Sequence, residues 1–199
     1  IDPTRFISSF RENQSKVESL SAKVARLRAL TQKKELVFSE SVIKNAPRVV
    51  QHERSLYLSN SQELEQQVSI HKRQLEQRHQ DYIEAKAALE QHTSALRLTN
   101  RELSVTRQLL RTGAISDIDI IRLERQIVDL NGEINRTKAV INRSLSAINE
   151  AKNKVTEVEL VMINRWNNEL SEALLRLDSI KETESSHFFP FVLSHHKKP

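Results

Sequence analysis

Several residue types that build compact globules are scarce in this chain of 199 residues. It has no cysteine, two glycines, four prolines and 5% aromatic residues. The absence of cysteine excludes disulfides, thiolate nucleophiles and cysteine-based zinc sites, and it is compatible with an oxidising compartment such as the periplasm. No apolar run approaches the roughly 20 residues that span a bilayer, and the N-terminus has no signal-peptide pattern. With so little turn chemistry, we expect long helices rather than a compact core.

Charge of one sign is also lacking. The chain has 31 Lys and Arg residues against 26 Asp and Glu residues, for a formal net charge of +5. The two signs alternate along the sequence, which is typical of solvated helix faces. A protein that follows a phosphate backbone is expected to gather its basic residues on one face. We therefore expect no nucleic-acid partner.

Motifs for catalysis are absent as well. No nucleophile elbow, zinc-protease helix motif or dinucleotide fingerprint occurs, and two glycines cannot form a phosphate-binding loop. His71 and His92 fall on the apolar stripe described next, 21 residues apart along one predicted helix. We interpret them as polar residues that set helix register rather than as metal ligands. The sequence predicts no enzyme, no metal site and no cofactor.

Two long heptad stripes are the main positive feature. A seven-residue apolar repeat keeps one side of a helix against a partner only if the helices supercoil, so it predicts a left-handed coiled coil. The stripes have equal extents on either side of Gly113, which predicts an antiparallel hairpin. The upstream stripe includes Val68, Leu75, Tyr82, Leu89, Leu96, Leu103 and Leu110, and the downstream stripe includes Ile120, Leu123, Ile127, Leu130, Ile134, Ile141, Ile148, Val155 and Met162.

A tight turn separates the stripes. Gly113 can adopt the left-handed conformation that ends a helix without a Cβ clash. Ser116 can cap the following helix, and Asp119, three residues later, completes a capping box. We therefore expect the chain to reverse at residues 112–116, with Gly113, Ser116 and Asp119 as the turn caps.

These patterns predict an all-α fold. The second and third predicted helices form an elongated antiparallel coiled-coil hairpin. The first, N-terminal helix is additional and packs near the base of the hairpin. The helical domain covers residues 1–182 and an irregular or disordered tail covers residues 183–199. The predicted parts of the helical domain are a first helix at about 5–33, a connector at 34–47, a second helix at about 48–111, a tip at 112–116 and a third helix at about 117–182.

The heptad spacing changes near the end of the third helix. Met162, Trp166 and Leu170 follow at intervals of four, which inserts a stutter. One interpretation is that the third helix leaves the second helix here and meets the first, with Trp166 at the junction. The other is that a large side chain simply fills the stutter.

The tip sequence, Leu109 to Asp119, resembles the hairpin of periplasmic adaptor (membrane fusion) proteins of the HlyD family. The opening segment at residues 1–6 is similar to that family's passage from a lipoyl domain into its first helix. The stretch with Phe38, Pro47 and Glu53 resembles the connector of the type I secretion branch. The resemblance extends over residues 1–182, and it implies that this chain is the helical part of a longer protein.

In that family an Arg, a Leu four residues later and a Ser seven residues after that contact an outer-membrane channel. Leu109 and Ser116 match this pattern, whereas Val105 occupies the Arg position and Arg107 and Arg111 are out of register. The resemblance implies a channel-docking tip formed by Leu109, Arg111, Gly113, Ala114, Ile115 and Ser116.

The implied function is a periplasmic adaptor that bridges an inner-membrane ABC transporter to an outer-membrane channel for type I protein secretion. The tip would dock on the channel, and parts of the full-length protein outside this chain would bind the transporter and anchor it in the inner membrane of a Gram-negative bacterium. Copies would form a homo-oligomeric ring, such as a hexamer, and this fragment would not contact the membrane. The alternatives are a drug-efflux adaptor, against which three helices argue, or a cytoplasmic coiled-coil scaffold or RNA-binding arm.

Overall fold

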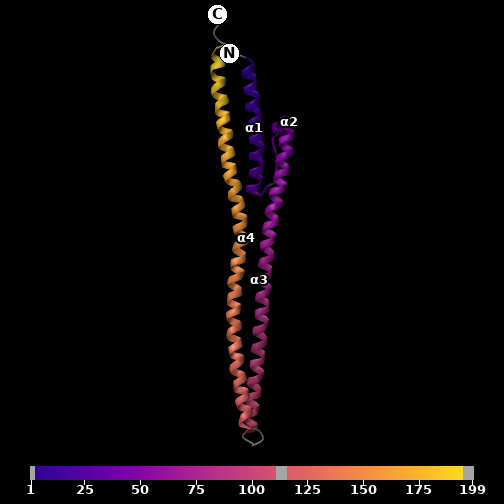
Figure 1. Cartoon of the computed structure of the whole chain (residues 1–199), viewed down its shortest axis with the longest axis vertical. Helices are drawn as coiled ribbons and strands as arrows, with labels where there is room; N and C mark the ends of the chain where they lie inside the picture. Colours follow the sequence, from indigo (N-terminus) through magenta and orange to yellow (C-terminus); the bar gives the residue numbers. More distant parts are fainter. Residues whose placement is uncertain (1–2, 111–115, 195–199) are drawn as a thin grey trace. The chain divides into compact units, whose positions relative to one another are not determined.

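The computed structural model describes residues 3–110 and 116–194, and the side chains of residues 7–110 and 116–183. The chain divides into two compact units, unit 1 (Ile1–Val68 with Glu157–Pro199) and unit 2 (Ser69–Thr156). All regular structure in the described residues is helical (Figure 1). The helices are α1 (Pro3–Gln32), α2 (Glu40–Asn45), α3 (Pro47–Leu110) and α4 (Asp117–Ser194).

The helix starts follow from local chemistry. Pro3 and Pro47 are the first residues of α1 and α3, where a missing N–H removes no helical hydrogen bond. α4 begins with Asp117 and has Asp119 in its first turn, where negative charge favours the helix dipole. The α3 sequence contains no glycine and no further proline, so nothing interrupts it. The three long helices begin and end within one or two residues of the predicted bounds, except at the end of α4.

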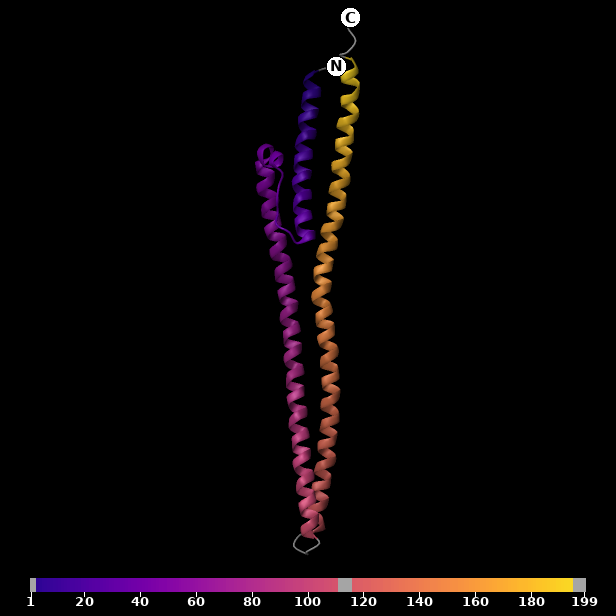
Figure 2. The same cartoon turned by 180° about the vertical axis from the view of Figure 1, so that it is seen from behind.

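Unit 2 is an antiparallel coiled coil. Its two segments, from α3 and α4, run side by side in opposite directions in both views (Figures 1 and 2). The predicted stripe residues of α4 in this unit are all buried or half-buried, and so are those named above for α3. Arg78, which the same heptad repeat places on the α3 stripe between Leu75 and Tyr82, is exposed. The all-α, coiled-coil hairpin prediction is therefore confirmed. The most deeply buried seam residues are Ala85, Thr99, Leu103, Leu123, Ile134 and Thr137.

Unit 1 has a core to which three helices contribute. Trp166 of α4 is 3% exposed and lies in a buried cluster with Leu27 and Leu30 of α1. Tyr57 and Leu64 of α3 pack against the same cluster. α4 therefore meets α1 at the stutter with Trp166 at the junction, as one interpretation predicted, but it does not leave α3, which still contributes Tyr57 and Leu64. The remaining members are Val24, Ala173, Met162, Ile163, Leu170 and Leu174.

A buried ion pair joins α1 to α3 in unit 1. Arg26 Nε donates to Glu53 Oε2 at 2.6 Å, and the two residues are 5% and 8% exposed. A buried charge requires a partner because its desolvation is costly. The pair therefore specifies which residue of α3 faces Arg26.

The end of α1 is a left-handed cap. Lys33 has φ of 52°, the Lys33 N–H donates to the Leu30 carbonyl at 3.3 Å, and the Lys34 N–H donates to the Ala29 carbonyl at 2.9 Å. This is the Schellman arrangement, formed here without glycine. The Tyr57 hydroxyl of α3 donates to the Lys34 carbonyl at 3.0 Å, and Lys33 Nζ pairs with Glu159 Oε2 of α4 at 2.9 Å. Contacts from two other helices thus hold this corner.

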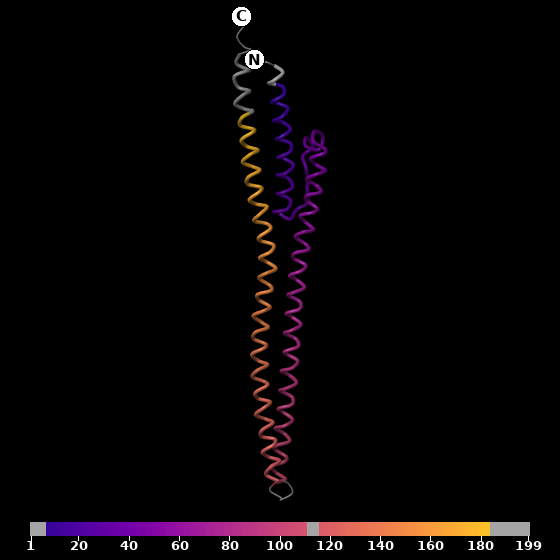
Figure 3. Tube along the Cα trace, viewed as in Figure 1, coloured from indigo at the N-terminus to yellow at the C-terminus, as the bar shows by residue number. Residues whose placement is uncertain are grey.

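The predicted connector contains a helix that the sequence analysis missed. The chain turns back along α1 after Lys34 and forms α2 before α3 begins (Figure 3). Phe38 and Val42 bury their side chains against Ala22 of α1. A helix of six residues spans less than two turns, so it shows no heptad pattern; tertiary burial stabilises it.

The end of α4 also differs from the prediction. The heptad pattern predicts that the third helix ends at about residue 182 and that an irregular tail covers residues 183–199, but α4 continues to Ser194. A heptad pattern reports burial, whereas a helix continues until a breaker stops it. Residues 183–189 contain no glycine or proline, and α4 ends one turn after Pro190.

The helices within the described ranges include none with an apolar stretch long enough to cross a membrane.

We expect Glu53→Leu to lower the free energy of unfolding by about 3–5 kcal/mol, because Arg26 then stays buried without a partner. The double variant Arg26→Leu/Glu53→Leu should recover most of this loss, since it removes both charges. Urea denaturation followed by circular dichroism measures both values. Glu172→Gln, which breaks an exposed pair with Arg176, is the control and should cost less than about 1 kcal/mol. A single variant as stable as the control would contradict the role assigned to the pair.

We expect Trp166→Ala to cost about 3–5 kcal/mol, because it leaves a large cavity among α1, α3 and α4. The matched control is Leu175→Ala on the same helix, whose side chain is exposed and should change stability by less than about 0.5 kcal/mol. The same denaturation measurement distinguishes the two. Equal stabilities would show that Trp166 does not support the core of unit 1.

Candidate functional site

The candidate site is the hairpin end of unit 2, where α3 ends at Leu110 and α4 begins at Asp117. Four of the predicted docking residues, Arg111, Gly113, Ala114 and Ile115, lie outside the described residues. The structure therefore describes the site through the two helix ends that flank them.

Ser116 occupies the N-cap position of α4. Its Oγ accepts a hydrogen bond from the Ile118 N–H at 3.3 Å, and its carbonyl accepts one from the Asp119 N–H at 3.1 Å. This satisfies one of the N–H groups that a helix start leaves without a partner. The Asp119 carboxylate lies 3.5 Å from Nη2 of Arg122, one turn further along the helix.

The two helix ends are joined in two ways. Leu103 of α3 and Leu123 of α4 are buried in the seam, and Arg107 Nη2 lies 2.7 Å from Glu124 Oε1. This ion pair places Arg107 and Glu124 at one level of the hairpin, along one edge of the seam. It pairs two of the charges near the turn, and both side chains remain partly exposed.

Two of the predicted docking residues are described. Leu109 has 43% of its surface exposed, although it lies beside the seam residue Leu110, and Ser116 is also exposed. Val105, which stands where the adaptor family has an Arg, is exposed on the same side of α3 one turn earlier. At position 105, α3 thus has an apolar side chain where the adaptor family has a charged one.

Two further apolar residues at this end were missed by the sequence analysis. Ile118 is 74% exposed and Ile121 is also exposed, both in the first two turns of α4. The signal was available, because large apolar residues outside a heptad stripe must point away from the seam. With Val105 and Leu109 on α3, they give each of the two helix ends exposed apolar residues that could contact another protein. None of the four provides an acid, base or nucleophile.

The described residues contain no group of three or more side chains suited to hold a metal ion. His71, half-buried on α3, has its Nδ1 3.0 Å from Gln74 Oε1. In unit 1, a hydrogen bond from Lys16 and then its charge lower the pKa of Glu12. None of these groups belongs to the hairpin end.

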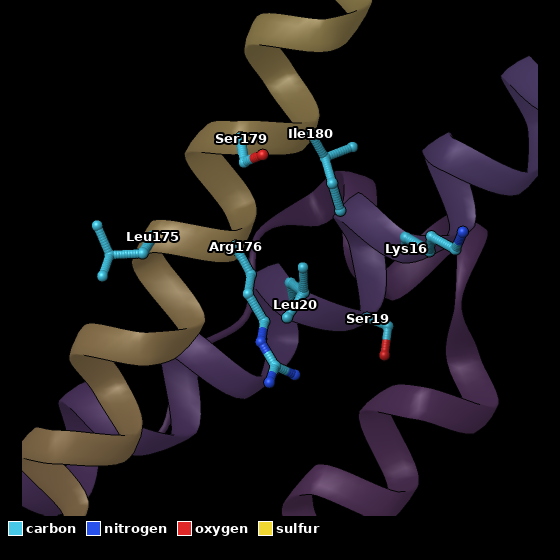
Figure 4. A pocket seen from close by; sticks show the side chains of 7 residues that line it. All are labelled: Lys16, Ser19, Leu20, Leu175, Arg176, Ser179 and Ile180. Carbon is cyan, nitrogen blue, oxygen red and sulfur yellow. The ribbon is translucent and has the colours of Figure 1, made fainter.

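Unit 1 has an open groove of about 550 Å³ between α1 and α4 (Figure 4). Leu20 and Ile180 lie between the two helices, Arg176 extends toward Leu20, and Leu175 points away. Arg176 and Lys16 are each paired with a glutamate on their own helix. The groove brings together no predicted site residue.

Comparison with known proteins identifies a similar solved structure and a matching family model. The fold is similar to the soluble domain of LipC, a membrane fusion protein of a type I secretion system, with a TM-score of 0.85, 14% sequence identity, and coverage of 96% of this chain and 74% of that chain. No curated protein matches the sequence. Residues 7–186 match the family model described as "AprE, long alpha-helical hairpin". Because this match takes in nearly the whole chain, the chain belongs to the family of the AprE long alpha-helical hairpin.

Proposed function

We propose that this chain is the helical hairpin of a periplasmic adaptor in type I protein secretion. The observation that carries the proposal is the match of residues 7–186 to the AprE hairpin family. The likeness to LipC, itself a membrane fusion protein of a type I secretion system, supports the same role. The adaptor bridges an inner-membrane ABC transporter to an outer-membrane channel, and it has no enzymatic activity.

The hairpin end is the part that docks on the channel. Leu109, Val105, Ile118 and Ile121 supply exposed apolar surface, and the ion pair between Arg107 and Glu124 engages nearby charge. Apolar surface in the middle of a contact contributes most of the binding energy, whereas rim charges contribute less. The other predicted docking residues, Arg111, Gly113, Ala114 and Ile115, follow α3 and precede α4 in the sequence.

The remaining parts of the function belong to the full-length protein. Segments outside this chain bind the transporter and anchor the adaptor in the inner membrane, and several copies surround the path of the secreted protein. Unit 1 favours this role over a drug-efflux adaptor, because α1 adds a third helix to the hairpin and buries Trp166 with it.

Photo-crosslinking in cells tests the docking role. We expect a probe at Leu109, Ala114 or Ile118 of the full-length protein to form an adduct with an outer-membrane channel, because these positions adjoin or form the proposed contact. A probe at Gln126, also exposed on α4 but further from the turn, is the matched control and should form none. Adducts are identified by immunoblotting and mass spectrometry.

Two results would count against the proposal. Equal adduct yields at Ile118 and Gln126 would show that the hairpin end has no special contact. No channel adduct from any probe, in a protein expressed at the normal level, would favour a scaffold or RNA-binding arm instead.

A further inference from the structure

The groove between α1 and α4 of unit 1 begins at the level where α3 begins. The ion pair between Arg26 and Glu53 places these residues of α1 and α3 at one level, and the two helices run in the same direction (Figure 1). Six residues before this pair, the α1 residue is Leu20 and the α3 residue is Pro47. Leu20 lines the groove, and Pro47 is the first residue of α3. Beyond this level α1 and α4 continue, whereas α3 does not.

On α1, the groove continues the side that α3 covers. Residues one heptad apart lie on nearly the same side of a helix. Ser19 is one heptad before Arg26, which pairs with a glutamate of α3. Lys16 is two heptads before Leu30, which lies in the core that α3 helps to form. Because Ser19 and Lys16 both line the groove, this wall of the groove is an extension of the α3-facing side of α1.

The same relation holds on α4. Arg176 is two heptads after Met162, which packs against the buried cluster of unit 1. Ile180 is two heptads after Trp166, which belongs to that cluster. Arg176 and Ile180 both line the groove. A helix placed in line with α3, beyond its start, would therefore lie in the groove and contact both walls.

Two cations lie at one level, one on each wall of the groove (Figure 4). The ion pair between Lys33 and Glu159 sets the levels of α1 and α4, which run in opposite directions. Lys16 is 17 residues before Lys33, and Arg176 is 17 residues after Glu159. The two cations therefore face the groove at the same level. The described residues that line the groove include no acid.

Each of these cations has a glutamate partner one turn away on its own helix. Lys16 pairs with Glu12 and Arg176 pairs with Glu172, and all four side chains are more than half exposed. Exposed pairs of this kind contribute little to stability. Either cation can therefore pair with a carboxylate of another molecule without leaving a buried charge unpaired. α3 supplies such a carboxylate to α1 in the buried ion pair described above.

We propose that the groove binds an amphipathic helix of another protein, with apolar residues against Leu20 and Ile180 and a carboxylate between Lys16 and Arg176. The helix would extend the three-helix packing of unit 1 beyond the start of α3, with apolar residues at intervals of three and four. The proposal goes beyond the channel contact, because the groove lies at the start of α3 and the hairpin turn follows the other end of this helix of 64 residues.

A designed peptide tests the chemistry of the occupant. The probe is a fluorescein-labelled peptide of three heptads with leucine at positions a and d and glutamate at e and g, where like charge also opposes self-association. Its matched control has lysine in place of every glutamate. We expect the acidic peptide to bind the full chain at least about tenfold more tightly in fluorescence anisotropy, because only its carboxylates complement the two groove cations. Equal affinities, or no binding of the acidic peptide, would overturn the proposal.

Charge reversal locates the binding. We expect Lys16→Glu/Arg176→Glu to weaken binding of the acidic peptide about tenfold, because each cation becomes a carboxylate. The control, Arg11→Glu/Lys181→Glu, changes the net charge equally and should alter the affinity less than about twofold. Each control residue is exposed and lies five residues from a groove cation, so it projects from another side of its helix. Circular dichroism should show the same helix content for all chains. Equal losses in the two variants would mean attraction by net charge alone, which contradicts binding in the groove.

Photo-crosslinking in cells identifies the occupant. The probe replaces Ser179, which lines the groove, in the full-length protein. The control probe replaces Lys181, two residues later and on nearly the opposite side of α4. We expect only the Ser179 probe to form an adduct, and mass spectrometry should map it to an apolar, acidic helical segment of another protein. An adduct with a second copy, with another segment of the same polypeptide or with a phospholipid would overturn the proposal, and so would no adduct.

The outcomes separate this inference from the proposed function. No adduct at Ser179, alongside a channel adduct at Ile118, would overturn the inference and leave the docking role standing. The expected adduct at Ser179 without any channel adduct at the hairpin end would support the groove contact while the docking role failed.

Discussion

Two packed helices can bury side chains on only one side of each helix. The rest of this structure depends on that constraint. In unit 2 the seam is narrow, so even heptad residues such as Ile127 and Ile141 are half-buried rather than buried. A seam of this kind leaves little margin for a bulky aromatic residue. In unit 1 α1 contributes a third side, and Trp166 is almost fully enclosed. The stutter after Met162 is the sequence change that turns α4 toward this wider core.

Periodicity predicted the parts of the fold that depend on repeated burial. The starts of α3 and α4, the buried side of unit 2 and the contact of α4 with α1 all follow from heptads, proline positions and one stutter. α2 could not be found this way, because its stability comes from Val42 and Phe38 meeting α1, which is a contact between segments distant in sequence. The end of α4 was misplaced because loss of an apolar pattern was equated with loss of helix.

For a similar reason, the sequence predicted the cap residue of the candidate site but not its exposed apolar residues. Local chemistry pointed to Ser116 as a cap, and the observed hydrogen bond has that geometry. The exposed residues Ile118 and Ile121 lie outside the heptad positions, so the periodic pattern of burial does not indicate them. In a thin coiled coil, however, the apolar residues that break the pattern are the ones available to other molecules.

The buried pair between Arg26 and Glu53 has a consequence for how α1 responds to tension along the helix axes. α1 and α3 run in the same direction within unit 1, and apolar contacts repeat every seven residues, so they resist sliding weakly. A slip of one heptad would set Arg26 beside Ala46 or Asn60, neither of which can neutralise it. This buried ion pair therefore opposes sliding of α1 along α3, because sliding must first separate Arg26 from the Glu53 carboxylate. Bending of the two helices together leaves the pair intact.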